Sequence, residues 1–173
     1  PEMKIEVAES LRGAHELVSQ ANQELQSART DQHGIIIRPE KAILEVTVSK
    51  TALRRSLLIM DALLKALVER GYEVQRGPGV RILGAVLHFG ISEELETKRE
   101  PVEDVDLEGR YDFAYNRFNQ KRTPSGALVL SISEGGAYWL NGCRHRWRDT
   151  EKKKLESRLN QFVAALVEMA RTD

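Results

Sequence analysis

The stretch from Ala52 to Arg70 constrains the fold of this chain more than any other feature. Its leucine and methionine residues recur at spacings of four and three, and further apolar residues widen the same face. This period is typical of an α-helix with one broad apolar side, and Gly71 suits the left-handed position that ends a helix. We therefore predict a deeply packed helix here, with Ser49 or Thr51 as its N-cap.

Segments on both sides of this helix alternate between apolar and polar residues. A period of two is typical of a β-strand with one buried face. Residues 80–83 and 86–91 flank Gly84-Ala85, a pattern that favours a hairpin. The expected strands are 42–48, 72–75, 80–83, 86–91 with an extension towards Arg99, 128–132, and 138–148 after a turn at Gly135-Gly136.

Helical patterns also occur near both ends of the chain. Residues 5–30 carry a thin apolar stripe on a polar surface, which predicts a helix that packs by one edge. Residues 150–170 carry a stronger stripe, and Asp149 is a suitable N-cap for that last helix. The predicted fold class is α+β: a single mostly antiparallel sheet with packed helices, plus an N-terminal helical arm. We expect residues 1–34 to form the helix and connector, and residues 35–173 the α+β domain.

Composition and charge exclude several classes of protein. The 173 residues include 26 Lys or Arg and 26 Asp or Glu, and this zero net charge argues against a globally basic nucleic-acid coat. No apolar run approaches the roughly 20 residues that cross a bilayer, and no secretory signal is visible, so we expect no membrane contact. Cys143 is the single cysteine, which fits a reducing compartment, and we expect a cytoplasmic protein.

Positive charge gathers where the last strand meets the last helix. From residue 144 to 148, arginines alternate with His145 and Trp147, so a strand would turn the arginines to solvent and Trp147 to the core. Guanidinium groups bind phosphate in a bidentate manner, which favours contact with nucleic acid or another anionic partner. The alternative is a solvated face that pairs with the acidic segment 93–112. The candidate contact residues are Arg144, Arg146, Arg148, Lys152, Lys153, Lys121 and Arg122.

Two further patterns point to metal chemistry. Glu96-Thr97-Lys98 resembles the Glu-x-Lys fragment of metal-dependent nucleases, where carboxylates hold magnesium, and Glu73 is the candidate second carboxylate. Residues 104–115 follow part of a calcium-loop pattern, but Tyr115 stands where a bidentate Glu is needed. The histidines lack metal-ligand spacing, and no glycine-rich turn opens a helix. We expect no catalytic residue, metal or cofactor, and keep a metal-dependent nuclease as an alternative.

Three segments together resemble a known group of proteins. They are residues 57–67, Pro124-Ser125-Gly126 before a strand, and residues 147–163. These segments are similar to the C-terminal portion of uncharacterised bacterial proteins that carry an N-terminal helix-turn-helix-like segment. The resemblance implies that the chain lacks the DNA-reading helix and is the partner, oligomerisation or sensing half of a DNA-associated protein.

The sequence thus predicts a non-enzymatic binding or interaction domain of a bacterial DNA-associated protein. Its basic strand and helix start would contact nucleic-acid phosphates or a protein partner. A homo-oligomerisation module is the alternative from a different class. In that case the first helix and the oppositely charged segments would supply the contact between copies.

Overall fold

The computed structural model describes residues 4–77, 79–101, 118–134 and 143–172. Within these ranges the helices are α1 (Glu16–Gln26), α2 (Lys50–Glu69) and α4 (Leu159–Thr172), with a short 3-10 helix, η2 (Leu155–Ser157). The strands are β1 (Val46–Thr47), β2 (Glu73–Gln75), β3 (Gly79–Ile82), β4 (Ala85–Pro101), β5 (Phe118–Glu134) and β6 (Cys143–Arg148).

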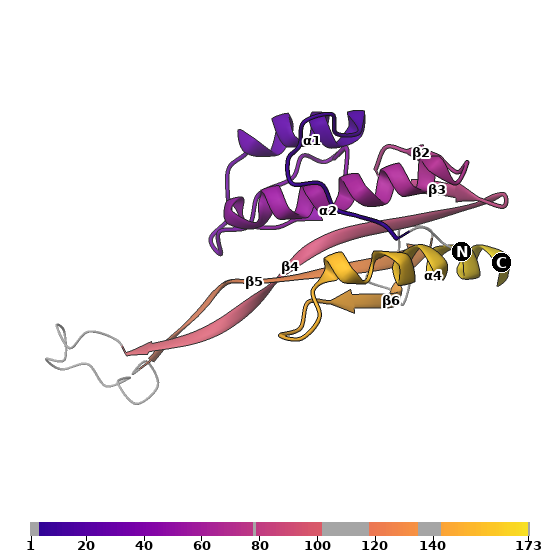
Figure 1. The fold of residues 1–173 in the computed structure, drawn as a ribbon. Coiled ribbons are helices and arrows are strands. Elements are labelled where there is room, and N and C mark those ends of the chain that lie inside the picture. Colours follow the sequence, from indigo (N-terminus) through magenta and orange to yellow (C-terminus); the bar gives the residue numbers. More distant parts are fainter. Residues whose placement is uncertain (1–3, 78, 102–117, 135–142, 173) are drawn as a thin grey trace, which may run out of the picture.

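All six described strands belong to one sheet, in the order β2-β3-β4-β5-β6, while β1 also pairs with β4 (Figure 1). The β1–β4 pairing is parallel and the other described pairings are antiparallel. The predicted α+β class with a mostly antiparallel sheet is confirmed. The strand expected over 42–48 is shorter than predicted, because β3 occupies the same edge of β4 as far as His88. Within this range Val46 and Thr47 pair with β4, opposite Ile91 and Ser92.

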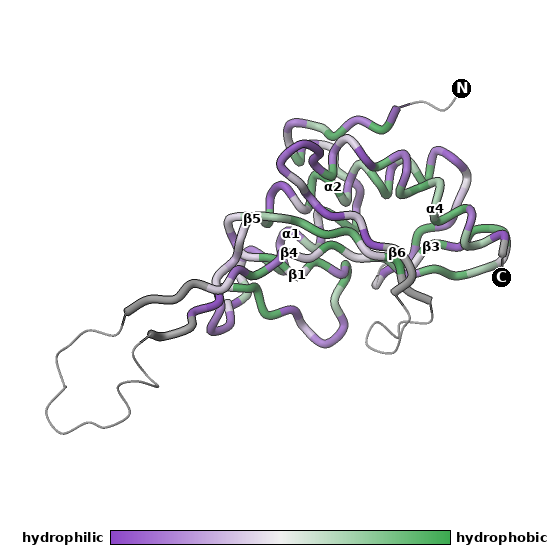
Figure 2. Tube along the Cα trace, turned by 90° about the horizontal axis from the view of Figure 1, so that it is seen from below, coloured by the Kyte–Doolittle hydropathy of each residue, from purple (hydrophilic) through white to green (hydrophobic). Residues whose placement is uncertain are grey.

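The apolar core lies between one face of the sheet and two helices. Helices α2 and α4 contact each other, and both contact β4. Figure 2 shows hydrophobic residues, in green, along these helices and the middle of the sheet. Phe162 of α4 is fully buried, and its ring lies edge-on to Phe89 of β4, with 5.6 Å between centroids. No helix in the described ranges is long and apolar enough to cross a lipid bilayer.

Both ends of α2 follow local sequence signals. The Ser49 hydroxyl accepts a hydrogen bond from the Ala52 amide at 3.3 Å, which confirms Ser49 as the N-cap. Gly71 adopts a φ of 84°. The Tyr72 amide donates to the Leu67 carbonyl at 3.1 Å, which closes the helix end in the expected manner.

The N-terminal region differs from the predicted helical arm. The helix covers Glu16–Gln26 rather than residues 5–30, because Gly13 has a φ of 72° and the His15 side chain caps the helix at Leu17. An arm is not confirmed, since the apolar stripe of α1 packs on α2 in the shared core. The division of the chain at residue 34 stays a prediction. The fully buried residues of α1 are Val18, Ala21 and Leu25.

Strands β4 and β5 are each 17 residues long and extend past the other described strands. Their pairs continue from Leu95–Pro124 to Pro101–Phe118, whereas β1 pairs only as far as Ser92 and β6 as far as Val129. Residues 95–101 and 118–124 therefore form a two-stranded ribbon, which we call the β4–β5 ribbon. It projects from the body of the molecule (Figure 1).

Replacement of Phe162 by Ala should remove the contact that joins α4 to the sheet. The free energy of unfolding should fall by about 3–5 kcal/mol, because a buried phenyl ring is lost and a cavity is left. Urea denaturation followed by circular dichroism measures this change. Gln161→Ala is the matched control on the exposed side of α4 and should change stability by less than about 0.5 kcal/mol. Equal effects of the two substitutions would contradict this account of the core.

Candidate functional site

Strand β6 separates the aromatic residue of the basic segment from its arginines. Trp147 lies against α4, with its ring centroid 5.1 Å from that of Phe162 and an interplanar angle of 76°. Arg146 and Arg148 flank Trp147 on the strand and are exposed. Because successive strand residues point to opposite faces, the arginines lie on the face away from the helices. The predicted alternation is confirmed for residues 146–148.

The backbone register of β6 is irregular at Arg144. The β5–β6 pairs pass from Ile132–His145 to Ser133–Cys143, a register shift that skips Arg144. A β-bulge of this kind breaks the alternation of side chains, which the sequence pattern alone does not reveal. The side chains of residues 143–145 lie outside the described residues, so the row of exposed arginines is described at Arg146 and Arg148.

A buried carboxylate follows β6 directly. The guanidinium group of Arg55, on α2, donates to both carboxylate oxygens of Asp149, at 2.6 and 2.8 Å. It also donates to both carboxylate oxygens of Glu156, at 2.8 and 2.6 Å. The amides of Leu128 and Leu155 each donate to Asp149 at 2.9 Å. Asp149 therefore joins α2, β5 and η2 at one point.

These contacts fix the protonation states of the cluster. Burial would raise the pKa of Asp149, but the hydrogen bonds from Arg55 and the two amides outweigh it and hold that pKa below its usual value. Hydrogen bonds from Arg55 likewise lower the pKa of Glu156. The two carboxylates in turn raise the pKa of Arg55. All three groups are therefore charged at neutral pH.

The prediction that Asp149 caps the last helix is wrong. Helix α4 begins at Leu159, and a turn closed by Thr150 and Lys153 comes between, with the Thr150 amide 2.8 Å from the Lys153 carbonyl. The Asp149 carboxylate is occupied by Arg55 and two amides, so it closes a loop instead of a helix. Lysines in a first helical turn would also oppose the helix dipole. Lys152 and Lys153 are exposed in this loop rather than in a helix.

Four of the predicted contact residues are described at the end of β6 and in the loop after it. We call Arg146, Arg148, Lys152 and Lys153 the cationic surface; all four are exposed. Arg148 forms an ion pair with Glu94 at 2.6 Å, although its side chain stays 64% exposed. Arg158 donates to the Arg148 carbonyl at 3.1 Å and so adds a further cation near this surface.

Lys121 and Arg122 lie elsewhere, on the β4–β5 ribbon. Both are exposed, and they pair with Lys98 and Thr97, so they point to opposite faces of the ribbon. Arg148 pairs with Val129, which lies opposite Ser92 of β4, whereas Lys121 lies opposite Lys98, six residues further along β4. At about 3.3 Å per residue the two groups of cations are about 20 Å apart. The structure therefore divides the predicted contact residues between two separate regions.

The two carboxylates of the predicted nuclease metal site, Glu73 and Glu96, are far apart. Glu73 lies on β2, two strands away from β4, and Glu96 lies ten residues beyond Val86, where β3 pairs with β4. That offset is about 30 Å along the strand, so Glu73 is not the second carboxylate of a Glu96 metal site. The calcium-loop pattern at 104–115 lies outside the described residues. Among described side chains, no group of three or more metal-binding residues occurs.

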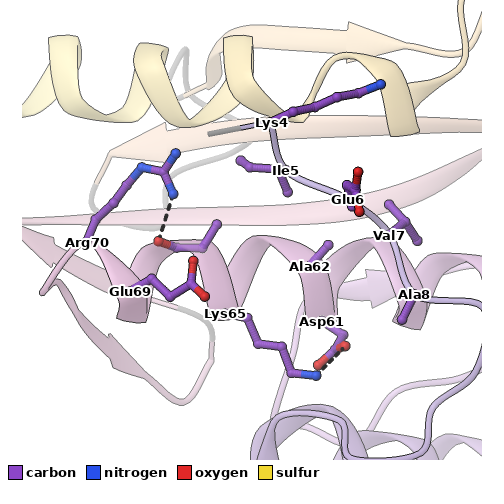
Figure 3. Close-up of a pocket in the computed structure, with 11 residues that line it drawn as sticks. Lys4, Ile5, Glu6, Val7, Ala8, Asp61, Ala62, Lys65, Glu69 and Arg70 are labelled. Atoms are coloured by element: carbon purple, nitrogen blue, oxygen red, sulfur yellow. Dashed lines mark hydrogen bonds and ion pairs between the residues drawn. The ribbon is translucent and has the colours of Figure 1, made fainter. Parts of the chain in front are cut away.

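A groove of about 670 Å³ lies between the N-terminal segment and α2 (Figure 3). Charged groups of both signs line it. Asp61 and Lys65 form an ion pair at 3.1 Å, and Arg70 donates to the Ala66 carbonyl at 3.0 Å. The groove thus has no predominance of one charge that would select a ligand.

Sequence reasoning missed the residues that organise the site. Arg55 stands beside Arg54 on a helix with a broad apolar face, and nothing in the sequence distinguishes the two. Glu94 and Arg158 also carry no local signal of their partners. No family of known sequence pattern, curated protein or solved structure matches this chain.

Arg55→Met should destabilise the protein by about 3 kcal/mol, the lower end of the range for a broken buried ion pair, because Arg55 is partly exposed. The loss arises because Asp149, with a side chain 2% exposed, keeps its charge without the guanidinium group. Arg54→Met is the matched control, since Arg54 makes one exposed hydrogen bond to a backbone carbonyl. It should cost less than about 1 kcal/mol. Chemical denaturation at neutral pH measures both values.

The same cluster should make stability depend on acid pH. Because the folded-state pKa values of Asp149 and Glu156 are lowered, their stabilisation is present above the unfolded pKa values of 3.8 and 4.5 and is lost as pH falls through the folded values. The unfolding free energy of the wild type should therefore fall below about pH 4.5. The difference between wild type and Arg55→Met should shrink over the same range. A difference that is constant from pH 7 to about pH 3 would contradict this assignment.

Proposed function

We propose that this chain is a non-enzymatic nucleic-acid-binding domain of a DNA-associated protein, and that the cationic surface contacts phosphates. The observation that carries the proposal is the pairing of Asp149 and Glu156 with Arg55. These two acidic residues lie within the basic C-terminal segment, yet their charges are directed inward to α2. The exposed cations of this segment, Arg146, Arg148, Lys152 and Lys153, then outnumber the exposed carboxylate of Glu151.

The exposure and chemistry of these cations support contact with phosphate. Arg146 and Arg148 lie on the sheet face away from the helices, and Lys152 and Lys153 follow in an exposed loop. The ion pair between Arg148 and Glu94 is a surface contact, and such pairs contribute about 0–1 kcal/mol. A phosphate can therefore replace Glu94 at little cost. Binding through these four groups needs no catalytic residue, metal or cofactor.

Affinity for duplex DNA should fall steeply with salt. Four phosphate contacts predict a slope of about −3 to −4 in a plot of log affinity against log salt, a loss on the order of 100-fold from about 50 to about 200 mM. Arg146→Gln with Arg148→Gln should reduce the slope by about 2. Fluorescence anisotropy with a labelled duplex measures both effects.

The matched control removes two cations from the helical side of the molecule. Lys65 of α2 and Arg171 of α4 are exposed, and Lys65→Gln with Arg171→Gln should leave the salt slope unchanged. Absence of wild-type binding at low salt, or equal slopes for the wild type and the Arg146 and Arg148 variant, would disprove the proposal.

A further inference from the structure

A second groove lies on the helical side of the sheet, between α4 and the end of α2. Its volume is about 490 Å³, within the usual range for small-molecule sites. We call it the α2–α4 groove; six residues of α4 line it together with Arg70 and Tyr72. All of these side chains belong to the part of the chain that the structure describes.

The α4 residues that line the groove share one face of that helix. They run from Asn160 through Val163 and Val167 to Arg171, at spacings of three, four and four. Such spacings place side chains on one side of an α-helix. At about 1.5 Å per residue, Asn160 and Arg171 are about 16 Å apart along the helix axis. The groove is therefore elongated, which suits an extended molecule better than a compact ion.

The middle of the groove is apolar. Val163 is buried, while Val167 and Tyr72 are partly buried and pack against the hydrophobic core. Because these side chains are held by the core, the apolar wall is present before any ligand binds. A hydrocarbon chain that covers this wall removes apolar surface from water, which favours binding.

Positive charge predominates among the groups that line the α2–α4 groove. Arg70 and Arg171 carry two positive charges, and Glu168 carries one negative charge. The groove of Figure 3 differs, since three cationic and three acidic residues line it. The excess of one positive charge in the α2–α4 groove fits a ligand with a single carboxylate.

The guanidinium group of Arg70 is held in place before binding. Arg70 is the C-cap of α2, is partly buried, and donates to the Ala66 carbonyl at 3.0 Å (Figure 3). This bond uses one of the five N–H donors of a guanidinium group, and a carboxylate binds such a group through two parallel hydrogen bonds. A donor that is already oriented lowers the entropy cost of binding.

We propose that the α2–α4 groove binds a small organic carboxylate with an aliphatic body. The carboxylate lies at Arg70 and Arg171, and the aliphatic body lies along Val163 and Val167. An inorganic anion such as phosphate would leave that apolar wall in water. This inference goes beyond the proposed function and is independent of it, because no residue of the groove belongs to the cationic surface.

The two arginines also have a structural role that needs no ligand. Arg70 stands at the C-terminal end of α2 and Arg171 in the last turn of α4, where a cation interacts favourably with the helix dipole. That role affects the stability of the free protein only. A change in stability on addition of a ligand therefore separates binding from the structural role.

The test uses hexanoate as the probe, with hexanol and hexylamine as analogues that have the same aliphatic body. For a Kd near about 1 mM, about 10 mM hexanoate should raise the Tm of the wild type by about 3 °C. Hexanol lacks the charge and hexylamine has the opposite one, so neither should raise the Tm by more than about 1 °C. Thermal unfolding followed by circular dichroism measures each shift.

Three variants locate the site. Arg70→Gln with Arg171→Gln should abolish the shift caused by hexanoate, because both cations of the groove are removed. Lys41→Gln with Arg76→Gln, which removes two exposed cations outside the groove, is the matched control and should keep the full shift. Glu168→Gln should increase the shift, because it removes the like charge that lies beside the carboxylate.

If the double variant at Arg70 and Arg171 fails to fold, Arg171→Gln alone keeps the test decisive. Arg171 is exposed in the last turn of α4, and its replacement should at least halve the shift. Amide chemical shifts in a nuclear magnetic resonance titration with hexanoate should change along residues 160–171.

Several outcomes would overturn the inference. They are no shift of the wild-type Tm at about 50 mM hexanoate, equal shifts with hexanoate and hexylamine, or an unchanged shift in both arginine variants. Chemical-shift changes confined to residues 146–153 would place the carboxylate on the cationic surface instead and would also overturn it. None of these results bears on binding of DNA, so the proposed function is tested separately.

Discussion

The guanidinium group of Arg55 is the point on which the C-terminal third of this structure depends. It makes four hydrogen bonds to two carboxylates, one of them deeply buried, and so joins α2 to the end of β6 and to η2. A buried carboxylate without such a partner is strongly destabilising. The path from Asp149 to Leu155, and with it the start of α4, follows from where Arg55 is placed.

The same contact decides the surface charge. Asp149 and Glu156 belong to a segment rich in Arg and Lys, and in an unfolded chain they would partly neutralise it. In the fold their charges face Arg55, while Arg146, Lys152 and Lys153 face solvent. The stability of the domain and the charge of its candidate binding surface thus share one cause, so a change at Arg55 affects both.

The sequence predicted those features that depend on interactions between residues close together in the chain. The apolar period and caps of α2, and the alternation that turns Trp147 inward, depend on near neighbours and were correct. Contacts between distant residues were not predictable: Arg55 and Asp149 are 94 residues apart, and a carboxylate before an amphipathic segment also fits a helix cap. The bulge at Arg144 depends on the partner strand, so the sequence of β6 alone could not reveal it.

Helix α2 and its N-cap hold two buried carboxylates, one at each end of the described β5–β6 region. Ser49, its N-cap, donates to Glu93 at the base of the β4–β5 ribbon, and Arg55, less than two turns further along, holds Asp149 beside the cationic surface. Both buried carboxylates also accept hydrogen bonds from amides of β5, at Gly126 and Leu128. Because one rigid helix holds both carboxylates, the spacing between ribbon and cationic surface is set by the helix rather than by loops.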